Sequence, residues 1–284
     1  MKKSKPRYVI FSDLDSTLLT DKTKKIPLRT VRYIRKLSRE GHIFVMASGR
    51  PLQAMLKYVK ALKINHPVVC DNGGIMYIPD NPKEYTYKYF VENVDAIENT
   101  IDKNISKMFL SDLDEIINAC FVSGIHANYI QNKALIPFWM VHPDSNIPLL
   151  EGKASEILNE DPLMITIYTS DYDKTMEIIN KYPHIKHQYW NNPKEGHAFE
   201  ISKAGTSKGY FIGEVCKMYN IDINNTICFG DQLNDISMFE SANISVAMCT
   251  SRAQVLEKAK YQTKCSCNKE GVYKFLKEFF KKSR

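Results

Sequence analysis

The sequence predicts an α/β protein: a doubly wound, Rossmann-like parallel sheet with an α+β segment inserted into it. Short apolar runs that suit buried parallel strands alternate with helical stretches over residues 1–84. The same alternation returns over residues 193–284, after a middle segment with a different pattern. Strand–helix–strand repeats at this spacing form right-handed βαβ units, so we expect both outer parts to build one sheet.

Three strands are predicted in the first part of the chain, and each ends at polar residues. They lie at residues 8–12, 43–47 and 67–70. Two helices separate them and open at Pro27 and Pro51, because proline suits the first helical turn. In open α/β sheets, ligands bind beyond the carboxyl ends of the strands, so the polar residues there are the candidates for chemistry.

The middle segment, residues 85–192, has the mixed pattern of an α+β domain with an antiparallel sheet. Its expected elements are a solvent-facing strand, two polar helices and two further strands, at 85–90, 93–104, 171–181, 120–122 and 164–168. We therefore predict a core domain of residues 1–84 and 193–284, and an inserted cap domain of residues 85–192.

The parallel pattern resumes in the last third of the chain. The expected elements are three strands and three helices, at 199–201, 226–229, 244–248, 206–220, from Ser251, and 272–280. Two of the strands end at, or are followed by, turns that contain glycine, Gly205 and Gly230.

Composition indicates a soluble globular protein, with 44% hydrophobic and 25% charged residues among 284. No apolar run approaches the roughly 18 residues that span a bilayer, and the basic N-terminus does not continue into a signal peptide. The seven cysteines, an odd number and mostly isolated, suit reduced thiols. We expect a cytoplasmic protein without a membrane partner.

The net charge of +7 belongs to the two ends of the chain. Basic residues without acids cluster at 2–7 and 281–284, so the body of the chain is formally neutral. A nucleic-acid site would need a basic patch on a folded face, and the sequence predicts none.

Four motifs carry the candidate chemistry. They are Asp13-x-Asp15-x-Thr17, Ser48-Gly49-Arg50, Gly205-Thr206-Ser207-Lys208-Gly209 and Gly230-Asp231-x-x-Asn234-Asp235. Alone, each has an ordinary explanation, since Asp and Ser cap helices or turns and a Lys at a helix start is usually solvated. Together they supply carboxylates, a cation and hydroxyls, which phosphoryl transfer requires.

In this order the motifs resemble those of the haloacid dehalogenase-like hydrolases, in particular the Cof-type branch (subclass IIB) with a C2-type α/β cap. The resemblance implies that Asp13 is the nucleophile that forms an aspartyl-phosphate, and that Asp15 is the general acid and base. It also implies a set of phosphate contacts: Thr17, Ser48, Gly49, Lys208 and Asn234. A general acid needs a raised pKa, which we expect neighbouring carboxylates to give Asp15.

Asp13 and a phosphate dianion repel each other, so a hard cation is expected between them. By resemblance this cation is Mg²⁺. Its implied ligands are the side chain of Asp13, the main-chain carbonyl of Asp15, Asp231, and Asp235 in the outer shell.

The sequence departs from the family pattern at three places. Ser16 stands where glycine is common, which removes the freedom for positive φ. Lys203 replaces a frequent proline, and Cys249-Thr250-Ser251 replaces a loop that lies near the site in relatives. The last change leaves open what this loop does to substrate preference.

We expect a phosphatase for small phosphate monoesters, with sugar phosphates favoured because the cap holds Trp139 and Trp190, on which sugar rings could stack. No arginine occurs between Arg50 and Arg252 to bind a second phosphate, which disfavours a phosphomutase of the same fold. A non-catalytic phospholigand-binding protein is a further alternative. A monomer or weak homodimer is expected.

Overall fold

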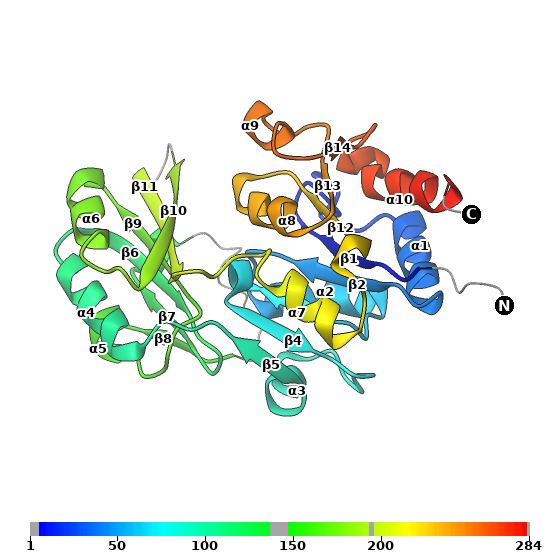
Figure 1. The fold of residues 1–284 in the computed structure, drawn as a ribbon. Coiled ribbons are helices and arrows are strands. Elements are labelled where there is room, and N and C mark those ends of the chain that lie inside the picture. The colour runs from blue at the N-terminus through cyan, green and yellow to red at the C-terminus, as the bar shows by residue number, and fades with distance from the viewer. Residues whose placement is uncertain (1–5, 137–146, 193–195, 283–284) are drawn as a thin grey trace.

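The computed structural model describes residues 6–136, 147–192 and 196–282, which form two β-sheets flanked by helices (Figure 1). Trp139, on which part of the sugar-phosphate expectation rests, lies outside the described residues. None of the helices within the described ranges combines the length and the apolar character that crossing a bilayer requires.

The first sheet contains eight strands in the order β14-β13-β12-β1-β2-β3-β4-β5. Their bounds are β1 Val9–Ser12, β2 Ile43–Ala47, β3 Val68–Cys70, β4 Ile75–Ile78, β5 Asp95–Glu98, β12 Thr226–Gly230, β13 Ile244–Ala247 and β14 Tyr261–Gln262. All pairings from β14 to β3 are parallel, whereas β4 and β5 are antiparallel additions at one edge. The predicted parallel sheet is confirmed.

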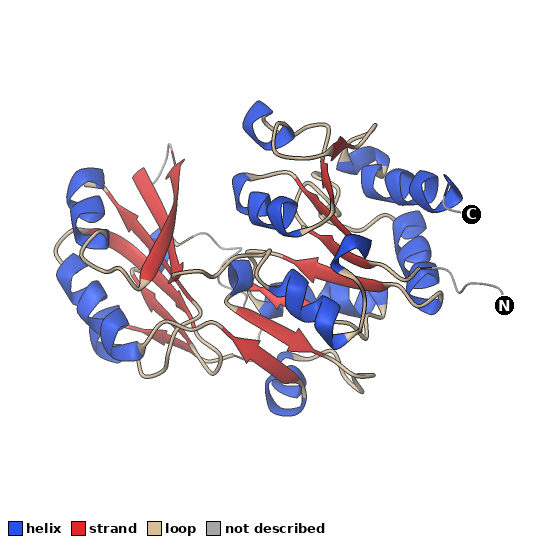
Figure 2. Cartoon of the chain, viewed as in Figure 1, coloured by secondary structure: helices blue, strands red, loops and turns tan. Residues whose placement is uncertain are grey.

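Helices cover both faces of this sheet (Figure 2). One face carries α1 (Leu28–Arg39), α2 (Leu52–Leu62) and α10 (Gly271–Lys282), and the other α7 (Phe211–Met218), α8 (Ile236–Ser241) and α9 (Ala253–Leu256). Alternate residues of β1 serve the two faces: Ile10 packs into one apolar cluster, and Val9 and Phe11 pack into the other. This is the doubly wound arrangement.

The second sheet contains six strands in the order β10-β11-β9-β6-β7-β8. Their bounds are β6 Ile117–Ser123, β7 Asn128–Gln131, β8 Leu149–Glu151, β9 Met164–Thr169, β10 Ile185–Asn192 and β11 Gly196–Lys203. All pairings are antiparallel except β7 with β8. The helices α4 (Lys103–Leu113), α5 (Ala154–Ile157) and α6 (Tyr172–Ile179) lie on the face turned away from the first sheet (Figure 1).

Short 3-10 turns occur at Asp71–Gly73, Lys133–Leu135, Ile223–Asn225, Leu233–Asp235 and Cys267–Lys269. Two of them, after β3 and after β12, lie at the carboxyl edge of the parallel sheet, where the candidate site was expected.

Three predicted elements differ in the structure. Residues 85–90 are not a strand: Thr86 caps a helix, α3 (Tyr87–Asn93), by accepting a hydrogen bond from the amide of Tyr89. The expected helix at 93–104 is strand β5 followed by a loop, because residues 95–98 pair with β4 at the sheet edge. The expected helix at 206–220 begins only at Phe211.

Two strands belong to a different sheet from the one that the expected cap boundaries, residues 85 and 192, would give them. Strand β5 joins the first sheet, although it lies inside the predicted cap, and β11 joins the second sheet, although it lies outside it. The chain thus passes between the sheets after residue 98 and again after residue 203.

Candidate active site

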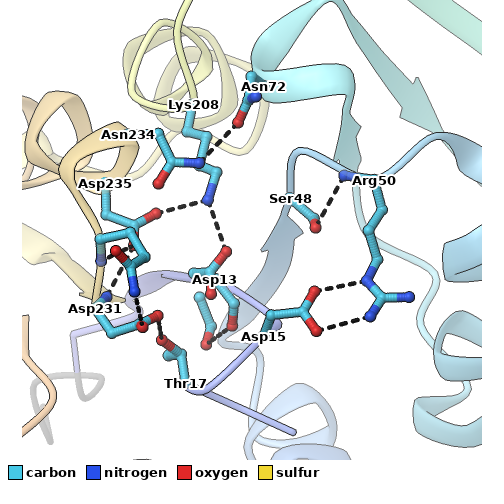
Figure 3. A network of polar contacts seen from close by, with 12 residues as sticks. Asp13, Asp15, Thr17, Ser48, Arg50, Asn72, Lys208, Asp231, Asn234 and Asp235 are labelled. Carbon is cyan, nitrogen blue, oxygen red and sulfur yellow. Dashed lines mark hydrogen bonds and ion pairs between the residues drawn. The ribbon is translucent and has the colours of Figure 1, made fainter. Parts of the chain in front are cut away.

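The loops that follow β1, β2 and β12 bring three of the four motifs to one edge of the parallel sheet, and the turn after β11 adds the fourth, with Lys208 (Figure 3). The amide of Asp13 donates to the carbonyl of Phe229 at 2.9 Å, which joins the end of β1 to the end of β12. The amide of Asn72 donates to the carbonyl of Ser48 at 3.0 Å and so joins the ends of β3 and β2. Parallel pairing of these strands therefore assembles the site.

Lys208 is the buried cation of the site. Its Nζ donates to Oδ1 of Asp13 and to Oδ1 of Asp235, both at 2.7 Å, and the side chain is 2% exposed. It lies in the turn after β11 rather than at a helix N-terminus, because α7 begins three residues later. Lys208 is therefore neither at a helix start nor solvated, and its two ion pairs hold it in place.

The loop after β12 positions Asp231 and Asp235. Oδ2 of Asp235 accepts hydrogen bonds from the amides of Asp231 and Gln232 at 2.8 and 3.0 Å. Gly230 permits this close turn, since a Cβ there would lie 2.3 Å from the Cβ of Asp235. The hydroxyl of Thr17, which the resemblance places among the phosphate contacts, donates to Oδ1 of Asp231 at 2.8 Å. In the structure it therefore orients a carboxylate of the site.

Burial and mutual repulsion shift the ionisation of these groups. Burial raises the pKa of Asp13, against the lowering effect of Lys208, and Asp235 and Asp231 raise it further. Burial and the charge of Asp235 raise the pKa of Asp231 to about 6. Burial opposes the charge on Lys208, but its two carboxylate partners keep the pKa of the ammonium above its usual value.

The Asp15 side chain points away from Asp13 and toward Arg50 (Figure 3). Arg50 donates to both carboxylate oxygens of Asp15, at 2.6 and 2.7 Å. Burial alone would raise the pKa of Asp15, but the hydrogen bonds and charge of Arg50, with Lys24 and Lys208, lower it. The expected raised pKa of Asp15 is therefore wrong for this arrangement, because a cation rather than a carboxylate is its neighbour.

A turn after β3 connects the site to the second sheet. Asn72 accepts a hydrogen bond from Nδ2 of Asn234 at 3.0 Å and donates from its own Nδ2 to Oε2 of Glu200 at 2.8 Å. Asp71 and Asn72 both have positive φ, 48° and 52°, which is strained for Asp. Gly73 follows with φ of 96° at a point where a Cβ would lie 2.3 Å from the carbonyl oxygen of Ser207.

Ser48 and Gly49 complete the edge of the site. Oγ of Ser48 accepts from the amide of Arg50 at 3.2 Å, and the side chain is 2% exposed. A Cβ on Gly49 would lie 3.0 Å from the amide group of Asn72, so a side chain there would push on the turn after β3.

The residues present fit a hard divalent cation. One carboxylate oxygen from each of Asp13, Asp231 and Asp235 lies within 4.8 Å of the others, and all three residues are buried. These are oxygen donors of the kind that Mg²⁺ prefers. Both carboxylate oxygens of Asp235 already accept hydrogen bonds, one from Lys208 and the other from two backbone amides. Asp235 is therefore less suited than Asp13 and Asp231 to bind a metal ion directly.

A sequence model of the haloacid dehalogenase-like hydrolases matches residues 10–276. The chain belongs to this family. It is 28% identical to 5-amino-6-(5-phospho-D-ribitylamino)uracil phosphatase of Bacillus subtilis, over 98% of this chain and 99% of that protein. The predicted resemblance is confirmed, and the enzyme class is that of the phosphatases.

Solved structures of the family have the same fold. A protein of Thermotoga maritima superposes with a TM-score of 0.76 at 24% identity, covering 96% of this chain and 97% of that one. A subclass IIB sugar phosphatase superposes with a TM-score of 0.74 at 21% identity, covering 96% of this chain and 98% of that one. The predicted core with an inserted α+β cap is thus confirmed as the fold.

Sequence reasoning did not identify the residues of the second sheet that line the site. Lys186, Gln188 and Glu200 line a cavity of about 250 Å³ together with Lys208 and Asn234. The sequence does contain a pattern that indicates Glu200. In a strand, an acid between Phe199 and Ile201 points to the face opposite to the one that these two apolar residues occupy.

Proposed function

We propose that this protein is a Mg²⁺-dependent phosphatase that hydrolyses small phosphate monoesters through an aspartyl-phosphate, with sugar phosphates as the preferred class. The observation that carries the proposal is the buried cluster of Asp13, Asp231 and Asp235 around Lys208 at the ends of the central strands. A phosphate dianion could not approach three carboxylates without cations beside it. Lys208 is one such cation, and the cluster would hold another.

Asp13 is the proposed nucleophile. Lys208 fixes the carboxylate through Oδ1, and the hydrogen bond from its amide to Phe229 fixes the backbone. Attack of a carboxylate oxygen on phosphorus forms one P–O bond as the ester P–O bond breaks, and the leaving oxygen takes a proton from Asp15. Water then attacks the phosphorus of the aspartyl-phosphate, and Asp15 accepts its proton. As the new P–O bond forms, the P–O bond to Asp13 breaks, which releases inorganic phosphate and restores the Asp13 carboxylate.

Asp15 has to leave Arg50 before it can perform this role. In the structure, the bidentate ion pair directs its carboxylate away from Asp13. A substrate phosphate that drew Arg50 toward itself would release Asp15 as a proton donor. Arg50 would then couple binding of the phosphate to acid catalysis.

Asp13 and Asp231 would hold Mg²⁺ directly, together with the main-chain carbonyl of Asp15, and Asp235 would act from the outer shell. When bound, the ion would neutralise charge on the phosphate oxygens. Thr17, Ser48, Gly49 and Asn234 would surround the phosphate together with Lys208.

The second sheet with α4, α5 and α6 would form the cap domain, and the first sheet the core domain. Sheet membership supports boundaries near residues 99 and 204 in place of 85 and 192. Residues of β10 and β11 close one side of the cavity beside Lys208, which supports a role of the cap in selecting the leaving group. We infer a cytoplasmic monomer or weak homodimer that acts on small molecules rather than nucleic acid.

The test is phosphate release from an aryl phosphate, with and without Mg²⁺, by the wild-type protein and by Asp13→Asn. We expect Mg²⁺-dependent turnover that Asp13→Asn lowers by at least about 10³-fold, because the variant lacks the nucleophile. Asp173→Asn, on the exposed face of α6, is the control and should match wild type. Absence of turnover by folded wild-type protein with Mg²⁺, on this ester and on sugar phosphates, would refute the proposal and favour a phospholigand-binding protein.

A further inference from the structure

The cavity beside Lys208 has a polar wall that the proposed chemistry does not use. One side of the cavity is formed by Lys208 in the turn after β11, Asn234 in the loop after β12 and Ser237 on α8. The second sheet forms the other side with Lys186, Gln188, Glu200 and Ser202. The first group faces the phosphate site. The second group lies where the body of a phosphate ester would extend.

Strand alternation explains why these side chains share one face. On β11, Phe199 and Ile201 pack into the apolar cluster under α4 and α6, so Glu200 and Ser202 point to the helix-free face. On β10, Gln188 is the register partner of Glu200, and Lys186 is that of Ser202. Two adjacent cross-strand pairs thus form a patch with donors and acceptors next to each other.

Glu200 is held in a defined orientation from the core side. Asn72 donates to Oε2 at 2.8 Å, and Asn72 is itself held by Asn234 at 3.0 Å. Among the described residues, the bond from Asn72 is the one hydrogen bond that the Glu200 side chain accepts. An ionised carboxylate can accept about four. Burial raises the pKa of Glu200 to about 7, so at pH 8 the side chain is mostly ionised and keeps acceptor capacity toward the cavity that it lines.

We propose that Glu200 is a specificity-determining residue, which accepts hydrogen bonds from hydroxyl groups on the leaving group of the substrate. Lys186 and Gln188 would donate to the oxygens of the same hydroxyls. A hydroxyl is both donor and acceptor, so a polyhydroxylated body matches this wall. An alkyl body would exclude water from the carboxylate and the ammonium without replacing the hydrogen bonds that water makes to them, which is costly.

This inference rests on the proposed phosphatase function and names the chemistry of its leaving group. Sites built to hydrogen-bond a substrate hydroxyl discriminate strongly against analogues that lack it. The six-carbon esters sorbitol 6-phosphate and n-hexyl phosphate differ in their hydroxyls and carry no other charged group, so they form a matched pair.

The experiment measures kcat/KM for both esters at pH 8, with Mg²⁺, in wild type and Glu200→Gln. Glutamine keeps the volume and an oxygen for Asn72, but it removes the charge and one acceptor oxygen. We expect wild type to prefer the sorbitol ester by about 10²-fold or more, and Glu200→Gln to reduce that preference at least about tenfold. Glu177→Gln, exposed on α6, removes a charge outside the cavity and should leave the preference unchanged.

The outcomes separate this inference from the proposed function. Wild-type turnover of both esters with equal kcat/KM would overturn the inference and leave the phosphatase function standing, and this comparison needs no variant. An equal loss on both esters in Glu200→Gln would also overturn it, because it would assign Glu200 to the reaction centre or to the fold. Failure of wild type on every ester, the aryl phosphate included, would refute the phosphatase itself.

Discussion

The turn after β3 combines a buried carboxylic acid with a left-handed backbone conformation. Asp71 is 1% exposed, has φ of 48°, and its Oδ1 is buried without a hydrogen-bond partner. Burial raises its pKa to about 7, although a hydrogen bond with Ser123 of β6 lowers it somewhat. In a different loop, the one after β1, Ser16 also has a positive φ, of 57°. The loop after β1 thus keeps the left-handed conformation that glycine favours. The expectation that serine removes this freedom is not met by the backbone.

Asp71→Asn should make the protein more stable, and by more at pH 8 than at pH 5. The folded pKa of Asp71 lies above the unfolded value near 4, so its contribution to stability falls as pH rises between the two values. Asparagine has no proton to lose and tolerates positive φ, so we expect a gain on the order of 1–3 kcal/mol at pH 8.

Chemical unfolding of both proteins at the two pH values measures this difference. Asp95→Asn, exposed on β5, is the matched control and should show no pH-dependent gain. A variant that is equally or less stable than wild type at pH 8 would show that the ionised Asp71 carboxylate stabilises the turn.

At the level of elements, periodicity predicted the parts of the fold in which burial alone decides the structure. The strands before Asp13, Ser48 and Asp231 are mainly apolar and buried throughout, and the sequence predicts them in the right places. Residues 85–90 were assigned to a strand because their aromatic residues alternate, yet Tyr87 and Phe90 are buried three residues apart on a helix. Strand β5 is exposed at an edge, so only its pairing with β4 defines it. Glu200 lines the cavity because β11 pairs with its neighbouring strands. Sequence periodicity predicts which face of a strand is buried, but not which strands pair.

Thr86→Val tests the helical assignment of this segment. Valine has the shape of threonine and favours strands, but it cannot accept the hydrogen bond from the amide of Tyr89. Loss of an N-cap typically costs about 0.5–2 kcal/mol, so we expect lower stability by about 1 kcal/mol in urea unfolding. An unchanged or higher stability would favour the extended conformation that the sequence pattern suggests.

For the whole molecule, one polar junction connects the two sheets to the catalytic edge. The crossing segment after β5 is held by Asn99, which donates from its amide to Gly74 at 2.7 Å and from its side chain to Gly73 at 3.0 Å. Asn72 on the same turn reaches both Asn234 and Glu200. Any displacement of one sheet relative to the other would therefore act on the turn that also contacts Asn234 in the loop after β12.

Mg²⁺ should stabilise the whole protein if the cluster holds it. A ligand that binds only the folded state stabilises by RT ln(1 + [L]/Kd), so millimolar Mg²⁺ should raise the Tm of wild type by a few degrees, and EDTA should reverse this. Asp231→Asn should lose most of the shift, because it removes a proposed ligand. Lack of any Mg²⁺-dependent shift in wild type would count against the proposed metal site.

The pairing of β1 with β12 also affects how the chain acquires its structure. Ile10 lies beside Ile227, so the strand that leads to Asp13 has neighbours on both sides only after more than two thirds of the chain is available. During synthesis, the first strands would wait with exposed apolar surface while the entire second sheet emerges. Such long-range pairing is slow to form, so premature termination before residue 226 should yield aggregating chains rather than a smaller working enzyme.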